Sequence, residues 1–211
     1  MKNVQKKGGV LVYPEYIDDV HYTNRAIRIN RDSPLYLGTV FGRTICTVLG
    51  QLSPSGQLRV LDEICADDCG LAMFAKDLLI PKLEDECRMH AASVYNFCDP
   101  AGNLKSCADM KTCVQFLRES VPGDTLIACA LGENPAMLRD SVAKRLRGRT
   151  QGNPGIIIGP KCKILRAGFQ GGYRFCSHDT TIRPERNMFS RAHEALQHLC
   201  YGLFKRQQGR I

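Results

Sequence analysis

Two acidic side chains stand where an α/β protein could build a reactive site. Asp99 follows the apolar run at residues 92–98, which predicts a buried strand, and it begins the sequence Asp-Pro-Ala-Gly. Open α/β sheets bind ligands at the carboxyl ends of their strands, so this carboxylate is a candidate for catalysis or metal binding. The same four residues are good turn formers, and a purely structural turn explains them equally well.

Glu194 is the second candidate, on a helix predicted at residues 189–204. The apolar face of that helix is formed by Ala192, Ala195, Leu196, Leu199 and Cys200. Glu194 lies one position from this face, where most carboxylates are simply solvated, and that is the alternative to a role in a site. Asp62 ends a predicted strand and Asp67 or Asp68 could cap a predicted helix, so these residues have structural explanations.

Several common catalytic patterns are missing from the sequence. There is no GxSxG, no GxxxxGK[ST] and no GxGxxG, so a serine-hydrolase elbow and both nucleotide-binding loops are unsupported. The five histidines show no metal-ligand spacing. The eleven cysteines are odd in number and contain no CxxC, which favours free thiols in a reducing cytoplasm over a zinc site or disulfides.

The charge of the chain favours a polyanionic partner such as nucleic acid. The net charge is +8 and the isoelectric point is near 9.0. The candidate phosphate-contacting residues are Lys144, Arg145, Arg147, Arg149, Lys161 and Lys163. A solvated helix end is the alternative explanation of the cluster at residues 144–149. No apolar run approaches 18 residues and the N-terminus lacks an apolar signal core, so we expect neither a membrane span nor export.

The elements that would position these side chains alternate between strands and helices. Apolar runs at residues 35–40, 44–52 and 57–64, joined by tight turns, predict a three-stranded antiparallel meander. Strands are then predicted at 92–98, 125–131 and 155–159, helices at 71–86, 110–120, 134–149, 160–167 and 189–204, and a hairpin at 170–175. The strand–helix–strand order makes residues 92–98 parallel to their neighbour. The fold class is therefore α/β, with a mixed sheet and helices on both faces. Residues 35–211 form the predicted domain, and residues 1–34 form a lead-in or linker that packs against it.

An ordered set of short stretches spans nearly the whole chain. They are Tyr13-Pro14-Glu15, His21, and residues 34–44, 49–52, 56–63, 97–102, 155–162, 168–173 and 187–197. Taken in this order, the set resembles the nuclease domain of tailed-phage terminase large subunits. The resemblance implies a ribonuclease-H-like fold and a metal-dependent endonuclease that cuts concatemeric phage DNA during genome packaging.

The same resemblance implies the contents of the site and the partners. Two Mg²⁺ or Mn²⁺ ions would clamp the attacking water and the leaving oxygen of a phosphodiester, held by clustered carboxylates. Asp99 and Glu194 match two of the ligand positions. The implied partners are double-stranded DNA, a terminase ATPase domain, the small subunit and the portal, in the cytoplasm of the host cell. The chain itself lacks a nucleotide-binding pattern, so we expect no bound nucleotide.

One position departs from the family pattern. Relatives carry Asp at the end of the first strand, where it bridges both metal ions, and this chain has Val40 there. Asp62 is a weak substitute, because it lies two strands away, roughly 9–10 Å at the usual strand spacing. Two hypotheses follow: a two-metal endonuclease with an altered site, or a nuclease-derived module that binds DNA or assembles with the packaging machinery without cutting.

Overall fold

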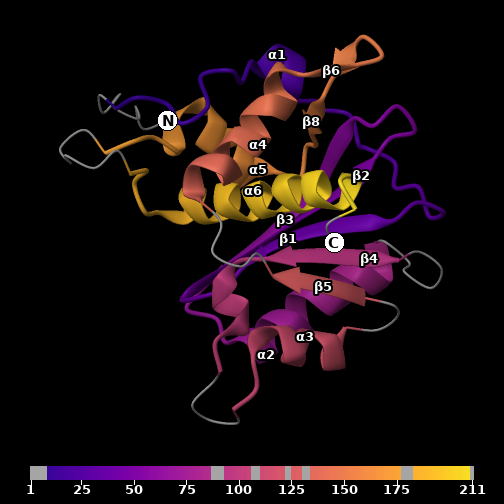
Figure 1. Ribbon diagram of the computed structural model, residues 1–211, viewed down its shortest axis with the longest axis vertical. Helices are drawn as coiled ribbons and strands as arrows, with labels where there is room; N and C mark the ends of the chain where they lie inside the picture. Colours follow the sequence, from indigo (N-terminus) through magenta and orange to yellow (C-terminus); the bar gives the residue numbers. More distant parts are fainter. Residues whose placement is uncertain are drawn as a thin grey trace.

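Three antiparallel strands form the centre of the sheet, as the apolar runs predict. β1 (Leu35–Val40), β2 (Thr44–Leu52) and β3 (Leu58–Asp67) follow one another through tight turns (Figure 1). Gly42 and Gly56 occupy these turns with φ angles of 139° and 87°, which a residue without a Cβ atom adopts readily. This computed structural model describes residues 9–86, 93–105, 110–121, 125–129, 134–176 and 183–209.

Parallel strands extend the meander at both edges. β4 (Val94–Cys98) pairs with β1, and β5 (Thr125–Cys129) pairs with β4. β8 (Ile156–Ile158) pairs with β3 at the other edge. The strand order is β5-β4-β1-β2-β3-β8, with β1 inside the sheet and its end beside the end of β4. The predicted mixed sheet and the parallel placement of residues 92–98 are confirmed. A separate ribbon joins β6 (Arg149–Thr150) to β7 (Asn153–Pro154).

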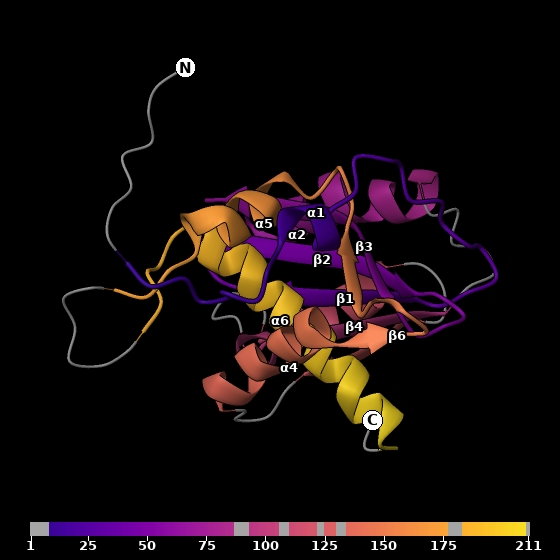
Figure 2. The ribbon, with the colours of Figure 1, turned by 90° about the horizontal axis from the view of Figure 1, so that it is seen from above.

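Helices cover both faces of the sheet, as predicted (Figures 1 and 2). One face carries α4 (Pro135–Arg147), α5 (Lys163–Ala167) and α6 (Met188–Gln207). The other carries α2 (Leu71–Met73), the π-helical turns η1 (Phe74–Leu79) and η2 (Lys82–Glu86), and α3 (Cys113–Ser120). In Figure 2, α6 runs obliquely across the strands with α4 beside it. No helix in the described part of the chain is long and apolar enough to cross a membrane.

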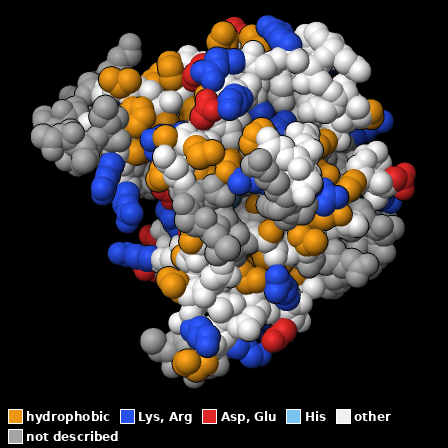
Figure 3. All heavy atoms as spheres, viewed as in Figure 1, with side chains coloured by type: hydrophobic (Ala, Val, Ile, Leu, Met, Phe, Trp, Pro, Cys, Tyr) orange, Lys and Arg blue, Asp and Glu red, His pale blue; other side chains and the backbone are white. Residues whose placement is uncertain are grey.

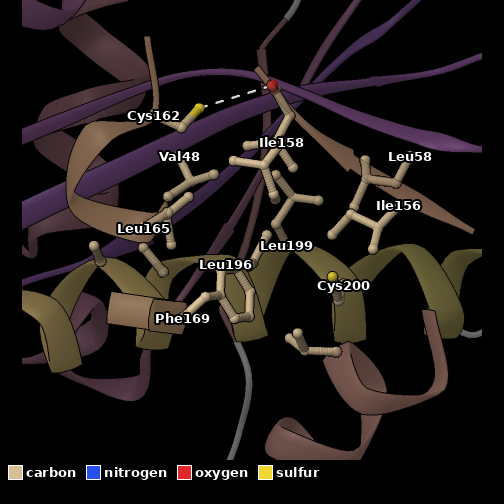
Figure 4. Close-up of a cluster of buried hydrophobic side chains, with 14 of the residues drawn as sticks. Val48, Leu58, Ile156, Ile158, Cys162, Leu165, Phe169, Leu196, Leu199 and Cys200 are labelled. Atoms are coloured by element: carbon tan, nitrogen blue, oxygen red, sulfur yellow. Dashed lines mark hydrogen bonds between the residues drawn. The ribbon is translucent and has the colours of Figure 1, made fainter. Parts of the chain in front are cut away.

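The larger core fills the space between α6 and the sheet. Figure 4 shows side chains of β2, β3 and β8 meeting those of α5, η4 and α6. Leu58, Ile156 and Leu196 are among the fully buried members of this cluster. The Cys162 thiol donates to the carbonyl of Val60 at 3.7 Å within the same layer (Figure 4). Burial of this apolar surface is what fixes α6 on the sheet, at about 25 cal/mol per Å².

Two glycines let α6 approach the central strands closely. A Cβ atom on Gly38 of β1 would lie 2.0 Å from the carbonyl oxygen of Ala195. A Cβ atom on Gly202 of α6 would lie 2.1 Å from the ring of Phe97 in β4. No side chain fits at either place, so the missing Cβ atoms set how near α6 lies to β1 and β4. This distance places the start of α6 beside the strand ends.

The segment before β1 lies against the domain. It contains the short helix α1 (Asp18–His21), and its side chains at Tyr13 and His21 are buried. The His21 Nε2 atom is 2.9 Å from the carbonyl oxygen of Leu146 in α4. Asp18 receives hydrogen bonds from Arg166, which lowers the pKa of this carboxyl to about 2. Where the domain boundary lies remains a prediction.

The predicted helix at residues 71–86 is helical but wound differently. Most of it is π-helical, and in this wider winding Phe74, Leu79 and Leu83 face the core. Leu78, which the 3.6-residue period assigns to the apolar face, is 39% exposed instead. The residue at the cap is Gly70, so the expected Asp67 or Asp68 cap is wrong. Asp67 ends β3 and bonds Thr44, because β3 runs three residues further than predicted.

Two further expectations are wrong. The hairpin predicted at residues 170–175 is a π-helical turn, η4 (Gly168–Gly172), in which Gly171 has a φ of 127°. Cys46 and Cys65 are joined by a disulfide rather than remaining free thiols. They are direct partners across β2 and β3 with Cα atoms 4.2 Å apart, a register that the spacing of the cysteines does not reveal.

Candidate functional site

A pocket of about 460 Å³ lies where β1 and β4 reach the edge of the sheet beside α6. We call it the strand-end pocket. Its lining includes Val40, Asp99, Glu194, Arg139, Arg183 and Arg186, with Tyr173, Gln197 and His198 behind them. The two predicted carboxylates therefore share one pocket with Val40. Parallel pairing of β1 and β4 and the close crossing of α6 are what bring them together.

Asp99 is held in place by backbone hydrogen bonds at the end of β4, the strand that it follows. Its N–H donates to the carbonyl of Thr39 at 3.0 Å, which continues the β1–β4 ladder by one residue. Its Oδ1 atom accepts the N–H of Phe41 at 3.3 Å. Pro100 then begins a single 3-10 turn, η3 (Pro100–Asn103), with a fixed φ that suits a first helical position. The carboxylate thus lies beside the end of β1 and also begins the turn, while its role in a site stays a prediction.

Glu194 is placed by the start of α6. Asn187 and Ser190 form a reciprocal capping box, with the Asn187 side chain accepting the Ser190 N–H at 2.9 Å. This fixes the first turn of the helix. Glu194 lies one turn further on, and its side chain is 35% exposed at the pocket. The helix is confirmed, with bounds one residue earlier and three later than predicted.

Arg191 occupies the space between Glu194 and the end of β1. Its Nη1 atom lies 2.6 Å from Oε2 of Glu194, and its Nη2 atom donates to the carbonyl oxygen of Phe41. Its Nε atom donates to the carbonyl of Thr44 at 3.3 Å. One guanidinium therefore joins α6 to the turn between β1 and β2. The i, i+3 spacing of Arg191 and Glu194 is a sequence signal that could have revealed this pair.

The environment of Asp99 makes it a weaker acid than usual. Burial raises the pKa of its carboxyl to about 6, and the negative charge of Glu194 acts in the same direction. The N–H of Phe41 and the charge of Arg191 oppose this shift without cancelling it. A half-buried carboxylate with a raised pKa that lines a pocket is a candidate for a functional residue, because reactive sites often combine these features.

The donors present do not fit the two-metal centre implied by the family resemblance. Val40 is 1% exposed and packs in the core, so it presents methyl groups where a bridging carboxylate is expected. One oxygen of Glu194 is already paired with Arg191. Within the described ranges, no three His, Cys, Asp or Glu side chains come together as a metal-binding group. Hard divalent cations need six or more oxygen ligands, and two carboxylates supply too few of them to hold a pair of ions.

Asp62 does not substitute for the missing carboxylate. It lies within β3 opposite Leu49, and its Oδ2 atom is 2.8 Å from Nζ of Lys82. Lys82 belongs to η2, which covers the other face of the sheet. Asp62 is therefore separated from the strand-end pocket by the sheet itself, a stronger reason than the strand spacing considered from sequence.

The predicted phosphate-contacting residues are spread over several places. Lys144 and Arg145 line a second pocket of about 460 Å³ between α4 and the end of α6, with Tyr201 and Phe204. Two cations of this cluster have acidic partners: Lys144 lies 2.8 Å from Asp140, and Arg147 lies 3.0 Å from Glu15. Lys161 and Lys163 lie at the start of α5, where Lys161 is 3.8 Å from Asp62. None of these residues lines the strand-end pocket, and their contact with DNA stays a prediction.

The arginines that do line the strand-end pocket were missed from the sequence. Arg139 lies on α4, and Arg183 and Arg186 lie on the segment that leads into α6. Arg183 and Arg186 follow Arg139 by 44 and 47 residues in the sequence, so the three arginines form no local cluster that a pattern could reveal. Figure 3 shows Lys and Arg side chains projecting at the left of this face, near the start of α6.

Comparison with known proteins identifies the fold. No family model and no curated protein matches the sequence. Two solved structures of the large terminase from a thermophilic bacteriophage each match 93% of this chain at 15% identity. Their TM-scores are 0.65 and, for the complex with ADP, 0.67. The P22 large terminase nuclease domain matches with a TM-score of 0.64 at 8% identity, covering 93% of this chain and 92% of that one. The chain spans about 46% of the length of the thermophilic phage terminase. The described structure therefore has the ribonuclease-H-like fold of large-terminase nuclease domains.

Proposed function

We propose that this chain is the nuclease-type domain of a DNA-packaging terminase, one that binds double-stranded DNA but does not cut it by the two-metal route. The absence of two-metal cleavage rests on one observation: Arg191 pairs with Glu194 and bonds the carbonyl of Phe41, next to the buried side chain of Val40. The fold supports a terminase nuclease-type domain, and the net charge of +8 supports binding to DNA.

Two-metal hydrolysis depends on oxygen ligands that hold both ions and face the scissile phosphate. A valine at the bridging position offers no oxygen. A cation that entered the pocket would also have to displace the Arg191 guanidinium from Glu194, and the displaced charge would then repel it. These two features act in the same direction, against a metal centre.

A second candidate is an endonuclease that retains part of the activity. Asp99 and Glu194 line the same pocket, and Arg191 is 24% exposed, so its side chain has room to swing away. The two carboxylates could then share one Mg²⁺ or Mn²⁺ ion and polarise a phosphodiester. This candidate is the endonuclease activity that the family resemblance implies, reduced by the loss of one metal ligand.

The likeness to large terminases also supports proposals about partners. A terminase ATPase domain, the small subunit and the portal would be the other members of the packaging assembly, in the cytoplasm of an infected cell. Cleavage of concatemeric DNA would fall to this domain only if the second candidate is correct. Otherwise the domain would contribute a grip on DNA or an assembly surface.

Plasmid nicking distinguishes the two candidates. Supercoiled plasmid is incubated in Mn²⁺ with the wild type, Asp99→Ala, Val40→Asp and the double variant Val40→Asp/Asp99→Ala, with Asp62→Asn as a control on the other face. We expect the wild type to nick plasmid no faster than Asp99→Ala does. We expect Val40→Asp to nick plasmid, and the double variant Val40→Asp/Asp99→Ala not to. Wild-type nicking that Asp99→Ala removes would establish the second candidate instead.

DNA binding is tested separately, by fluorescence anisotropy with a duplex in EDTA. We expect salt-dependent binding by the wild type, because release of counterions from phosphates dominates such affinity. A wild type that shows no salt-dependent binding at low ionic strength would refute the DNA-binding half of the proposal.

A further inference from the structure

The strand-end pocket contains more cationic than acidic side chains, once the pairing of Glu194 is taken into account. Three arginines line it, and Arg191 lies against Glu194 from the side. Asp99 is then the carboxylate without a cation at hydrogen-bonding distance among the described residues. A pocket built to concentrate divalent cations would show the opposite balance, with carboxylates outnumbering arginines.

The three lining arginines have guanidinium groups available for a ligand. Within the part of the chain that the structure describes, no carboxylate forms an ion pair with Arg139, Arg183 or Arg186. Arg183 and Arg186 are exposed, and Arg139 is half-buried with its guanidinium carbon 5.8 Å from the ring centre of Phe175. Guanidinium groups bind phosphate oxygens through paired N–H donors, which makes arginine the usual residue for this ligand.

The backbone that carries Arg183 and Arg186 is held on both sides. Pro184 bridges to Phe175, and the N–H of Cys176 donates to the carbonyl of Arg183 at 2.9 Å. Beyond Arg186, the capping residue Asn187 begins α6 and also donates to the carbonyl of Gly172 at 3.2 Å. Two arginines on an anchored segment lose little backbone freedom when they bind, so the pocket is organised before its ligand arrives.

The back wall of the pocket supplies neutral polar groups. Gln197 donates to the hydroxyl oxygens of Tyr13 at 2.9 Å and Tyr173 at 3.2 Å. Burial raises the pKa of Tyr173 to about 12, so its phenol stays protonated and adds no negative charge at neutral pH. The wall therefore does not oppose an anion in front of it.

From this arrangement we infer that the strand-end pocket is a metal-independent phosphate site, in which Arg139, Arg183 and Arg186 hold a phosphate group of DNA. The inference rests on the proposed function for the identity of the ligand and on the pocket for its chemistry. Arg191 has a separate role in this site: it neutralises Glu194 and holds the end of β1, so that the carboxylate does not repel the phosphate.

Duplex binding in EDTA tests the inference with two variants of equal charge change. Arg183→Gln/Arg186→Gln removes two pocket arginines, and Arg28→Gln/Arg31→Gln removes two exposed arginines from the segment before β1. We expect the pocket variant to bind a duplex about tenfold more weakly, with a salt slope reduced by about 1 to 2. The control variant should stay within about twofold of the wild type.

Three outcomes overturn the inference or separate it from the proposed function. Equal losses in the two variants, with a wild type that binds DNA, would leave DNA binding intact and refute the pocket. Binding that requires Mg²⁺ and disappears in EDTA would refute metal independence. Arginine Nε–H signals that shift on titration with inorganic phosphate in the wild type, but not in the pocket variant, would support the site even if duplex binding failed.

Duplexes with and without 5′-phosphates, compared with a closed circular duplex, distinguish the source of the phosphate. Equal affinity for circular and linear DNA would assign the pocket to internal phosphodiesters. A gain that needs the 5′-phosphate would assign it to DNA ends. Both results support a phosphate ligand, provided that the pocket variant binds the internal phosphodiesters more weakly in the first case or loses the gain from the 5′-phosphate in the second. Circular dichroism of each variant checks that the fold is kept.

Discussion

The Nη1 atom of Arg191 lies 2.6 Å from Oε2 of Glu194, one helical turn away on α6, while the same guanidinium reaches the carbonyl of Phe41 at the end of β1. An ion pair of this kind, partly shielded from water, holds its carboxylate more firmly than a pair on an open surface. Its partner Glu194 lines the strand-end pocket together with Val40, a side chain that offers no oxygen. Arg191 is thus a cation already paired with one of the two carboxylates that the family resemblance implies as metal ligands.

Restoring oxygen ligands should create divalent-cation affinity. We expect the wild type to bind Mn²⁺ no tighter than millimolar, and Val40→Asp/Arg191→Gln to bind at least about tenfold tighter, because a carboxylate is added and Glu194 is released. Isothermal titration calorimetry measures both. Arg191→Gln alone should gain less than the double variant. Micromolar binding by the wild type would contradict the role assigned to Arg191.

The close crossing of α6 over β1 should be sensitive to a single methyl group. Gly38→Ala places a Cβ atom 2.0 Å from the carbonyl oxygen of Ala195, so the helix must move. We expect a loss of about 2–4 kcal/mol in the free energy of unfolding, measured with urea, a cost of the size seen for overpacked or strained cores. Gly70→Ala is the matched control, because a Cβ atom there has nothing within 4 Å and Gly70 has an extended backbone. Equal effects of the two changes would contradict the packing argument.

Asp99 should lower stability at neutral pH. Its pKa in the folded protein, about 6, lies above its ordinary value of 3.8, so the folded state binds more protons between these pH values. The free energy of unfolding therefore falls as pH rises from about 4 to 6, and stays lowered above that. Asp99→Asn should stabilise the protein at pH 7.5 by about 1–3 kcal/mol and by much less at pH 4. Urea unfolding at the two pH values measures this, and a destabilised Asp99→Asn variant at pH 7.5 would contradict it.

His193, next to Glu194 on α6, should stay neutral well into the acid range. Its ring is buried, stacked 4.7 Å from Tyr173 and edge-on 4.4 Å from Phe169, and burial lowers its pKa to about 3. Because the ordinary value is 6.5, the stability that depends on the neutral ring is lost as pH falls below about 6.5. Proton NMR should show no titration of the assigned His193 imidazole signals above pH 5 in the folded protein. A midpoint near 6.5 would mean that the ring is exposed to water.

Local patterns predicted the strands and most of the helices, because those patterns are set by neighbours in the chain. Apolar runs and turn residues identified the meander at residues 35–64, and the strand–helix–strand order was enough to predict that β4 is parallel to its neighbour, which is β1. The wide π-helical winding after Leu71, which buries Phe74 and Leu79, escaped prediction because a 3.6-residue period assumes α-helical winding. The disulfide between Cys46 and Cys65 escaped for a related reason, because it depends on the register of β2 and β3.

By itself, the sequence determined which residue types were available: a carboxylate after the fourth strand, another on the last helix, and a valine at the end of the first strand. Only the tertiary structure decided that Asp99, Glu194 and Val40 share a pocket, and that Asp62 lies on the other side of the sheet. It also gathered Arg139, Arg183 and Arg186 around that pocket. Such proximity depends on strand pairing and on the close approach of α6 over Gly38, and contacts between distant parts of a chain leave no periodic trace in the sequence.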